Sequence, residues 1–170
     1  MLKELRKDAD IIIKKAIESA LPDSAVKKAL KNFPDVKGKI ILVSIGKAGW
    51  QMAAAAYSVL SDRINGGVVV TKYDHNKGPI GNLEIVEAGH PVPDENSYKG
   101  TEKAINAVKD LGKDDMVLFL VSGGGSALFE KPLIPSSDME KLTSELLASG
   151  ASITEMNTIR KRMSSVKGGK

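Results

Sequence analysis

An α/β fold, with a mainly parallel sheet between two layers of helices, is predicted by three observations. Short apolar runs alternate with segments of helical periodicity along most of the 170 residues. The apolar runs are nearly continuous, as in strands that are buried on both faces of a parallel sheet. The length is that of one α/β domain, so we expect residues 1–170 to form a single domain.

The first two elements are predicted helices. Apolar residues recur at helical spacing from Leu2 to Ala20, with charged residues on the other face, and this predicts an amphipathic helix. A shorter helix is expected to begin at Pro22, because proline suits the first helical turn, and to stop at Pro34. Neither segment carries a candidate catalytic group.

Four short apolar runs are predicted strands. They are residues 39–45, 67–71, 83–88 and 116–121. Helical segments follow or separate them, so the connections are expected to be right-handed crossovers. The sequence therefore predicts a three-layer, Rossmann-like arrangement with helices on both faces of the sheet.

The remaining helices are predicted from composition and capping signals. Residues 50–60 are rich in alanine, and Asp94 or Asn96 is expected to cap a helix that runs to about residue 110. Ser137 with Glu140, and Ser152 with Glu155, form two capping-box patterns. We expect each to open a further helix, the first ending near residues 149–150.

Composition excludes several classes of protein. The chain has no cysteine, which excludes disulfides, Fe–S clusters, thiolate zinc sites and cysteine nucleophiles. Its apolar runs are too short to span a membrane, and its N-terminus carries acidic residues and no cleavable apolar core, unlike a signal peptide, so we expect a cytoplasmic protein. The net charge of +4 arises after Glu155; residues 1–155 hold 20 basic and 21 acidic side chains. We therefore do not expect nucleic-acid binding.

The strongest candidate site follows the last predicted strand. Ser122, Gly123, Gly124, Gly125 and Ser126 combine three glycines, which let backbone N–H groups approach an anion, with two hydroxyl donors beside a helix end. This pattern indicates a cradle for a phosphate or a carboxylate. The alternative is a tight turn that needs glycine for its geometry alone.

Familiar nucleotide and hydrolase patterns do not match this loop. No stretch has the glycine, lysine and hydroxyl spacing of a P-loop. A dinucleotide pattern built on Gly123 and Gly125 would need glycine at Leu128, and a serine-hydrolase elbow around Ser126 would need glycine there too.

Two further loops carry candidate residues. Lys47, between Gly46 and Gly49, follows the first strand and would place a cation at the same sheet edge; the alternative is a solvated lysine. His90 lies in a proline-rich loop after the third strand, where it is a candidate for proton transfer or a histidine bonded to backbone. Two histidines without cysteine do not predict a zinc site, and the sequence assigns no metal ligands.

The C-terminal segment is the last candidate site. If residues 153–163 are helical, Asn157, Arg160 and Lys161 share one face that could hold an anion, although a solvated basic helix is the alternative. Lys167 and Gly168 follow in what looks like another anion-cradling turn.

Four motifs, in this order, resemble the N-terminal portion of the glycerate 2-kinase family, whose C-terminal part is called the MOFRL domain. They are residues 46–48, 89–94, 121–128 and 155–169. The similarity spans about residue 5 to the end of the chain. It implies an ATP-dependent, Mg²⁺-requiring enzyme that phosphorylates D-glycerate at its 2-hydroxyl and gives 2-phosphoglycerate and ADP.

The resemblance also implies roles for residues. Lys47 matches the family's active-site lysine and would neutralise the substrate or the transferring phosphoryl group. Lys47, Ser126, Asn157 and Arg160 would bind the substrate. Phosphate or nucleotide contacts would come from Ser122, Gly123, Gly124, Gly125, Ser126, Lys167 and Gly168, with His90 and Lys161 as further candidates.

Family chains continue into a second α/β domain, and the active site lies in the cleft between the two. We therefore expect residues 1–170 to be the N-terminal domain of a two-domain kinase, inactive without its partner domain. Without that domain an apolar interface would be exposed, so self-association into a homo-oligomer is predicted. The alternatives are an NAD(P)-dependent hydroxypyruvate reductase and a non-catalytic module that binds phosphorylated metabolites.

Overall fold

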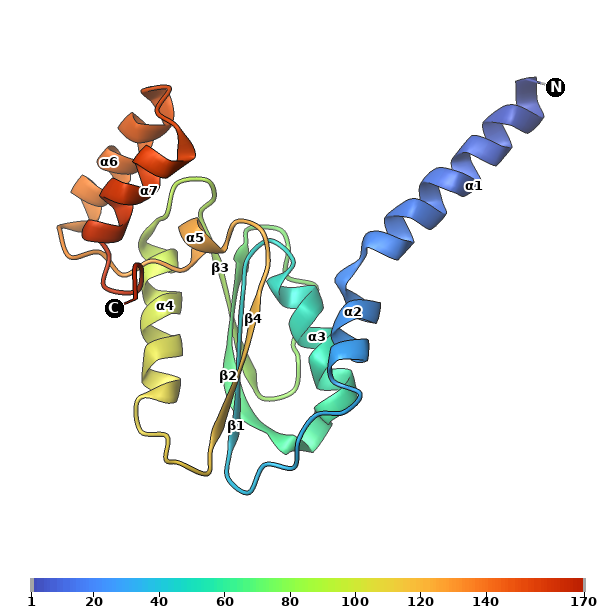
Figure 1. The fold of residues 1–170 in the computed structure, drawn as a ribbon, viewed down its shortest axis with the longest axis horizontal. Coiled ribbons are helices and arrows are strands. Elements are labelled where there is room, and N and C mark those ends of the chain that lie inside the picture. The colour runs from blue at the N-terminus through green and yellow to red at the C-terminus, as the bar shows by residue number, and fades with distance from the viewer. Residues whose placement is uncertain (1, 170) are drawn as a thin grey trace.

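The computed structural model describes residues 2–169 and confirms the three-layer α/β fold (Figure 1). Its sheet has four strands in the order β3-β2-β1-β4, and every neighbouring pair is parallel. The strands are β1 (Ile40–Ile45), β2 (Ile64–Lys72), β3 (Leu83–Ala88) and β4 (Met116–Val121). The strand order reverses between β1 and β4, which makes the carboxyl ends of these two strands the expected place for a ligand.

Helices cover both faces of this sheet. In chain order they are α1 (Leu2–Ala20), α2 (Pro22–Ala29), α3 (Gly49–Leu60), the short 3₁₀ helix η1 (Ser61–Arg63), α4 (Glu95–Val108), α5 (Gly125–Leu128), α6 (Ser136–Ala148) and α7 (Ile153–Arg162). Helix α3 packs on one face together with α2, and α4 packs on the opposite face (Figure 1).

The central strands form the core because their side chains are apolar on both faces. Every residue of β1 is buried, as its continuous apolar run predicts. Leu42 contributes to the cluster beneath α3, and Val43 contributes to the cluster beneath α4. The sheet therefore holds the β1 end rigidly where the candidate site begins.

Strand β4 departs from the expectation of a sheet covered on both faces. Half-buried and exposed residues alternate along it, because it lies at the edge of the sheet, where α4 covers it only in part. Val117, Phe119 and Val121 are 41%, 45% and 59% exposed on the face that α4 covers elsewhere. An apolar strip is therefore open to solvent in this chain, and self-association through it remains a prediction.

Two helical parts extend beyond the sheet layers. Helix α1 forms as predicted but projects away from the body, and none of its described residues is buried (Figure 1). Helices α6 and α7 form a hairpin beside α5. No helix within residues 2–169 is both long and apolar enough to cross a membrane.

The capping predictions have different outcomes. Asp94 caps α4 and Ser152 caps α7, each with the reciprocal bonds of a capping box. The predicted box of Ser137 and Glu140 is wrong, because α6 begins at Ser136 after Pro135 and no side chain caps it. With the rigid Pro135 at the N-cap position, the helix begins two residues earlier than the serine pattern indicates.

Candidate functional site

The turn from β1 to α3 and the loop after β4 are bonded together where the strand order reverses. The Lys47 N–H donates to the Gly123 carbonyl at 2.8 Å, and the Ala48 N–H donates to Ser122 Oγ at 3.0 Å. The Ser122 hydroxyl donates in turn to the Ile45 carbonyl at 3.1 Å. Ser122 therefore uses its side chain to hold the Lys47 turn in place.

Gly124 lies against both Lys47 and His90. A Cβ atom at this position would lie 2.8 Å from His90 Cδ2 and 3.2 Å from Lys47 Cγ. Its φ of +86° is also in the left-handed region, which favours glycine. The structure thus brings three predicted residues together from three separate loops, and glycine is required for their close approach.

The electrostatics of this group favour a neutral histidine. Burial lowers the pKa of His90, and the positive charges of Lys47 and Lys72 lower it further. The imidazole is therefore uncharged near pH 7 and able to accept a proton. Lys47 is exposed, and no carboxylate within residues 2–169 forms an ion pair with it.

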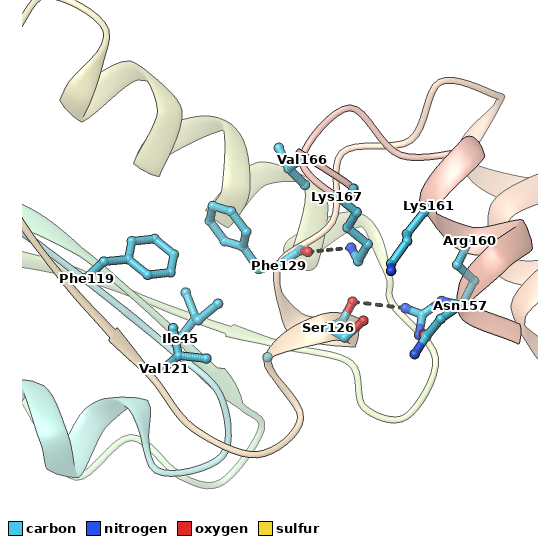
Figure 2. A pocket seen from close by; sticks show the side chains of 12 residues that line it. Ile45, Phe119, Val121, Ser126, Phe129, Asn157, Arg160, Lys161, Val166 and Lys167 are labelled. Atoms are coloured by element: carbon cyan, nitrogen blue, oxygen red, sulfur yellow. Dashed lines mark hydrogen bonds between the residues drawn. The ribbon is translucent and has the colours of Figure 1, made fainter. Parts of the chain in front are cut away.

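We call residues 122–126 the glycine-rich loop, and a cavity of about 410 Å³ lies on its other side (Figure 2). Apolar residues at the ends of β1 and β4 form its floor, together with Phe119 and Phe129. Its polar wall contains Ser126, Asn157, Arg160, Lys161 and Lys167. Gly125 and Gly168 also line it.

The wall combines residues that the sequence separates by 31 to 41 positions. Figure 2 shows Arg160 and Asn157 of α7 facing Ser126, with Lys161 between them and Lys167. Arg160 Nη2 donates to the Ser126 carbonyl at 2.9 Å. The predicted basic face of residues 157–161 is therefore turned towards the glycine-rich loop and not only towards solvent.

Lys167 is held more firmly than its motif indicates. Its Nζ donates to Glu130 Oε2 at 2.6 Å and to the Phe129 carbonyl at 2.8 Å. Burial lowers the pKa of Lys167, although the carboxylate of Glu130 opposes that shift. The lysine contributes charge to the cavity while its hydrogen bonds are directed inside the protein.

The predicted residues thus fall into two groups. Lys47, His90 and Gly124 lie together at the β1 and β4 ends, with Ser122 and Gly123 beside them. The cavity residues form the second group, and neither Lys47 nor His90 lines that cavity. The helix expected after the triple glycine is α5, which has only four residues, so it offers little of the positive helix end that the sequence suggested.

Glu130 was not predicted from the sequence. Between Phe129 and Lys131 it reads as an ordinary solvated side chain, yet it is 0% exposed. Its burial depends on Lys167, which lies 37 residues further along the chain. No local pattern signals a contact of that kind.

Comparison with known proteins identifies the family. A family described as "Domain of unknown function (DUF4147)" matches residues 8–170. The chain belongs to this family. Its similarity to named glycerate 2-kinases confirms the resemblance of this DUF4147 chain to the N-terminal part of that family.

Relatives of this DUF4147 chain are longer than it is. A D-glycerate 2-kinase of Thermotoga maritima is 54% identical over 170 residues, which are 99% of this chain and 40% of that protein. A protein of Agrobacterium vitis named "Putative hydroxypyruvate reductase" is 47% identical over 156 residues, which are 91% of this chain and 35% of that protein.

A solved structure confirms the fold. The crystal structure of a glycerate kinase from Thermotoga maritima matches with a TM-score of 0.88 and 55% identity, over 98% of this chain and 40% of that chain. The DUF4147 chain therefore spans about two fifths of the length of these kinases.

Proposed function

We propose that this chain provides the N-terminal half-site of an ATP-dependent D-glycerate 2-kinase, which forms 2-phosphoglycerate and ADP. The observation that carries the proposal is the group formed by Lys47, His90 and Gly124 at the point where the strand order reverses. The names of the kinase relatives supply the substrate and the reaction.

The residues of this group suit phosphoryl transfer, which depends mainly on positioning and on neutralising charge. Bound ATP with Mg²⁺ would supply the phosphoryl group. The exposed ammonium of Lys47 would neutralise charge on the substrate or on that group. The neutral imidazole of His90 is able to take the proton from the 2-hydroxyl of glycerate.

The cavity wall suits the anionic parts of the reactants. Ser126, Asn157 and Arg160 would bind the glycerate carboxylate or a phosphate, and Lys161 adds a further cation. Within residues 2–169 no three His, Asp or Glu side chains are grouped to hold a metal ion. We assign no residue of the chain to Mg²⁺.

The rest of the site would come from a second domain, which corresponds to the part of the kinase relatives that this chain does not cover. We also propose that the enzyme is cytoplasmic. The apolar strip of Val117, Phe119 and Val121 is a surface that such a domain would cover.

A hydroxypyruvate reductase is the second candidate, because a relative carries that name. The strand order β3-β2-β1-β4 is compatible with a dinucleotide-binding fold. The first strand-to-helix turn, however, reads Gly46-Lys47-Ala48-Gly49 and lacks the spacing of the dinucleotide fingerprint. This observation favours the kinase.

An assay for ADP release decides between the candidates. It would use D-glycerate, ATP and Mg²⁺ with two proteins: this chain alone, and this chain joined to the part of the Thermotoga maritima relative that it does not cover. We expect ADP only from the joined protein. NADH oxidation by hydroxypyruvate without ATP would instead identify a reductase, and tight binding of phosphorylated metabolites without turnover would identify a binding module.

A further inference from the structure

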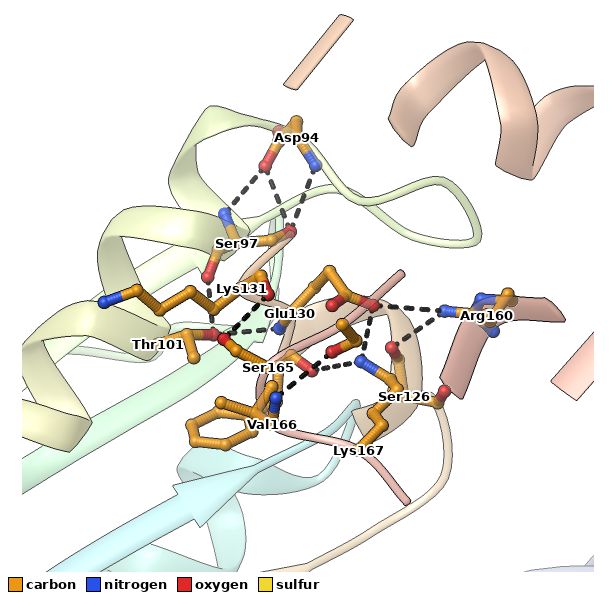
Figure 3. Close-up of polar contacts among 12 residues, drawn as sticks. Asp94, Ser97, Thr101, Ser126, Glu130, Lys131, Arg160, Ser165, Val166 and Lys167 are labelled. Carbon is orange, nitrogen blue, oxygen red and sulfur yellow. Dashed lines mark hydrogen bonds and ion pairs between the residues drawn. The ribbon is translucent and has the colours of Figure 1, made fainter. Parts of the chain in front are cut away.

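Glu130 is a fully buried carboxylate beside the cavity (Figure 3). Its Oε2 accepts a hydrogen bond from Lys167 Nζ at 2.6 Å, and Arg160 Nη2 lies 4.0 Å from the same oxygen. Both cations are largely buried, with side chains 14% and 13% exposed. A buried carboxylate is strongly unfavourable unless cations and hydrogen bonds compensate it, so the burial of Glu130 requires these contacts.

The position of Glu130 is fixed from the side of the sheet. Its backbone N–H donates to Thr101 Oγ1 at 2.9 Å. Within α4, the Thr101 hydroxyl donates in turn to the Ser97 carbonyl at 2.8 Å. Figure 3 shows this chain of contacts running from α4 through Glu130 to the two cations. Glu130 therefore connects the rigid α4 layer to side chains contributed by α7 and the segment after it.

Three cations line the cavity, and we call Arg160, Lys161 and Lys167 the cation wall. With Glu130 they carry a net charge of +2, three positive groups against one negative group. Lys161 is exposed and forms no ion pair within the described part of the chain. Arg160 Nε is buried and has no hydrogen-bond partner within that part. The cation wall therefore has hydrogen-bond donors, on Lys161 and Arg160, that form no contact within the described part of the chain.

We propose that Glu130 is a positioning residue, which holds Arg160 and Lys167 side by side so that the cation wall binds one phosphoryl or carboxylate group. Glu130 would not touch that group; Lys161, Arg160 and Asn157 would. The inference rests on the proposed function and names the chemical class of ligand that this part of the site takes. It differs from a purely structural ion pair because it predicts a change in anion binding.

The test compares three variants of this chain in a titration with inorganic phosphate, followed by NMR. Glu130→Gln keeps the shape of the side chain and removes its charge. We expect phosphate affinity to fall about tenfold, because Lys167 and Arg160 lose the carboxylate that positions them, and we expect this loss to outweigh the rise of the net charge from +2 to +3. Glu102→Gln is the matched control, since Glu102 forms an exposed ion pair with the neighbouring Lys131 at 3.6 Å; it should change affinity less than about twofold.

Glu130→Asp covers the case in which the glutamine variant does not fold. The aspartate keeps the charge but is one methylene shorter. We therefore expect its phosphate affinity to lie between that of the wild type and that of Glu130→Gln. Wild-type phosphate affinity in Glu130→Asp, or in a folded Glu130→Gln, would overturn the proposal.

A second readout reports on Lys167 itself. Without the carboxylate, burial and the positive charge of Arg160 lower the pKa of this amine unopposed, so acetic anhydride should acetylate it faster relative to Lys161. Mass spectrometry measures the ratio, and an unchanged ratio would contradict the role of Glu130. Because neither readout uses ATP, glycerate or turnover, a failed kinase assay leaves the inference standing. Absence of phosphate binding by the wild type would overturn it even in an active kinase.

Discussion

Lys47 and Lys167 lie on either side of the same glycine-rich loop, but in opposite surroundings. Lys47 is exposed and its side chain lies beside Gly123 and Gly124. No carboxylate within residues 2–169 forms an ion pair with it. Lys167 is largely buried and bonded to Glu130 and to a backbone carbonyl. A lysine beside glycines in a sequence therefore has two outcomes: one leaves the cation available to a ligand, and the other makes it part of the fold.

The largest effect is expected when Lys47 is replaced by alanine in the joined, two-part enzyme. We expect kcat/KM for D-glycerate to fall about 100-fold or more, the loss typical of removing one transition-state contact. Lys113→Ala is the control, because Lys113 is exposed near the opposite end of β4. A wild-type value of kcat/KM in Lys47→Ala would contradict the proposed role of this lysine.

The reverse pattern is expected for Lys167. Lys167→Met leaves the buried carboxylate of Glu130 without its main donor, so the free energy of unfolding should fall by about 3 kcal/mol. Lys47→Met should change it by no more than about 0.5 kcal/mol, since Lys47 is exposed. Urea denaturation measures both. Equal stability of the two variants would mean that the Glu130 contact contributes little to the fold.

A smaller effect distinguishes two neighbouring glycines. Gly124→Ala places a Cβ 2.8 Å from the His90 ring and strains a left-handed backbone, so we expect a loss of about 1–2 kcal/mol in stability. Gly123→Ala meets nothing nearer than Lys47 Cε at 3.9 Å and should be close to neutral. Thermal unfolding compares them, and similar melting temperatures would contradict the close packing around Gly124.

The smallest effect concerns His90. Its pKa lies below the ordinary 6.5 because of burial and of the charges on Lys47 and Lys72. Lys47→Ala should raise this pKa without restoring the ordinary value, and an NMR titration of the imidazole measures it. The unfolded chain takes up this proton more readily than the folded one, so the His90 contribution to stability should decrease as pH falls below about 6.5. No change in the pKa would show that the charge of Lys47 does not reach His90.

The sequence predicted the sheet well because buried strands have a local signal. Residues 83–88 and 116–121 were predicted with the bounds that the structure has. Strand β2 begins at Ile64, three residues before the prediction, because Asn65 and Gly66 break its apolar run. Asn65 accepts a hydrogen bond from the Ile40 N–H at 2.8 Å, and a contact of this kind between strands has no signature in local composition.

The candidate site was predicted only in part, for a related reason. Motif and strand position located Lys47 and the glycine-rich loop, since the carboxyl ends of parallel strands meet at one edge. The direction of the Lys167 side chain depends on Glu130, and the exposure of one face of β4 depends on how much of the sheet α4 covers. These features come from tertiary packing, so no pattern within the sequence could supply them.

The α6–α7 hairpin leaves and returns to the body at a single point. Pro132 and Ser164 form an antiparallel bridge, and hydrogen bonds join Leu133 to Met163 and Ser165 to Lys131. The two ends of the hairpin therefore lie side by side, and its length can change without altering the path of the strands. It carries Asn157, Arg160 and Lys161, whereas Lys47 and His90 lie in loops that directly follow β1 and β3. Insertions, deletions or exchange of this one module could thus vary the anion-binding wall across evolution while the rest of the site stays as it is.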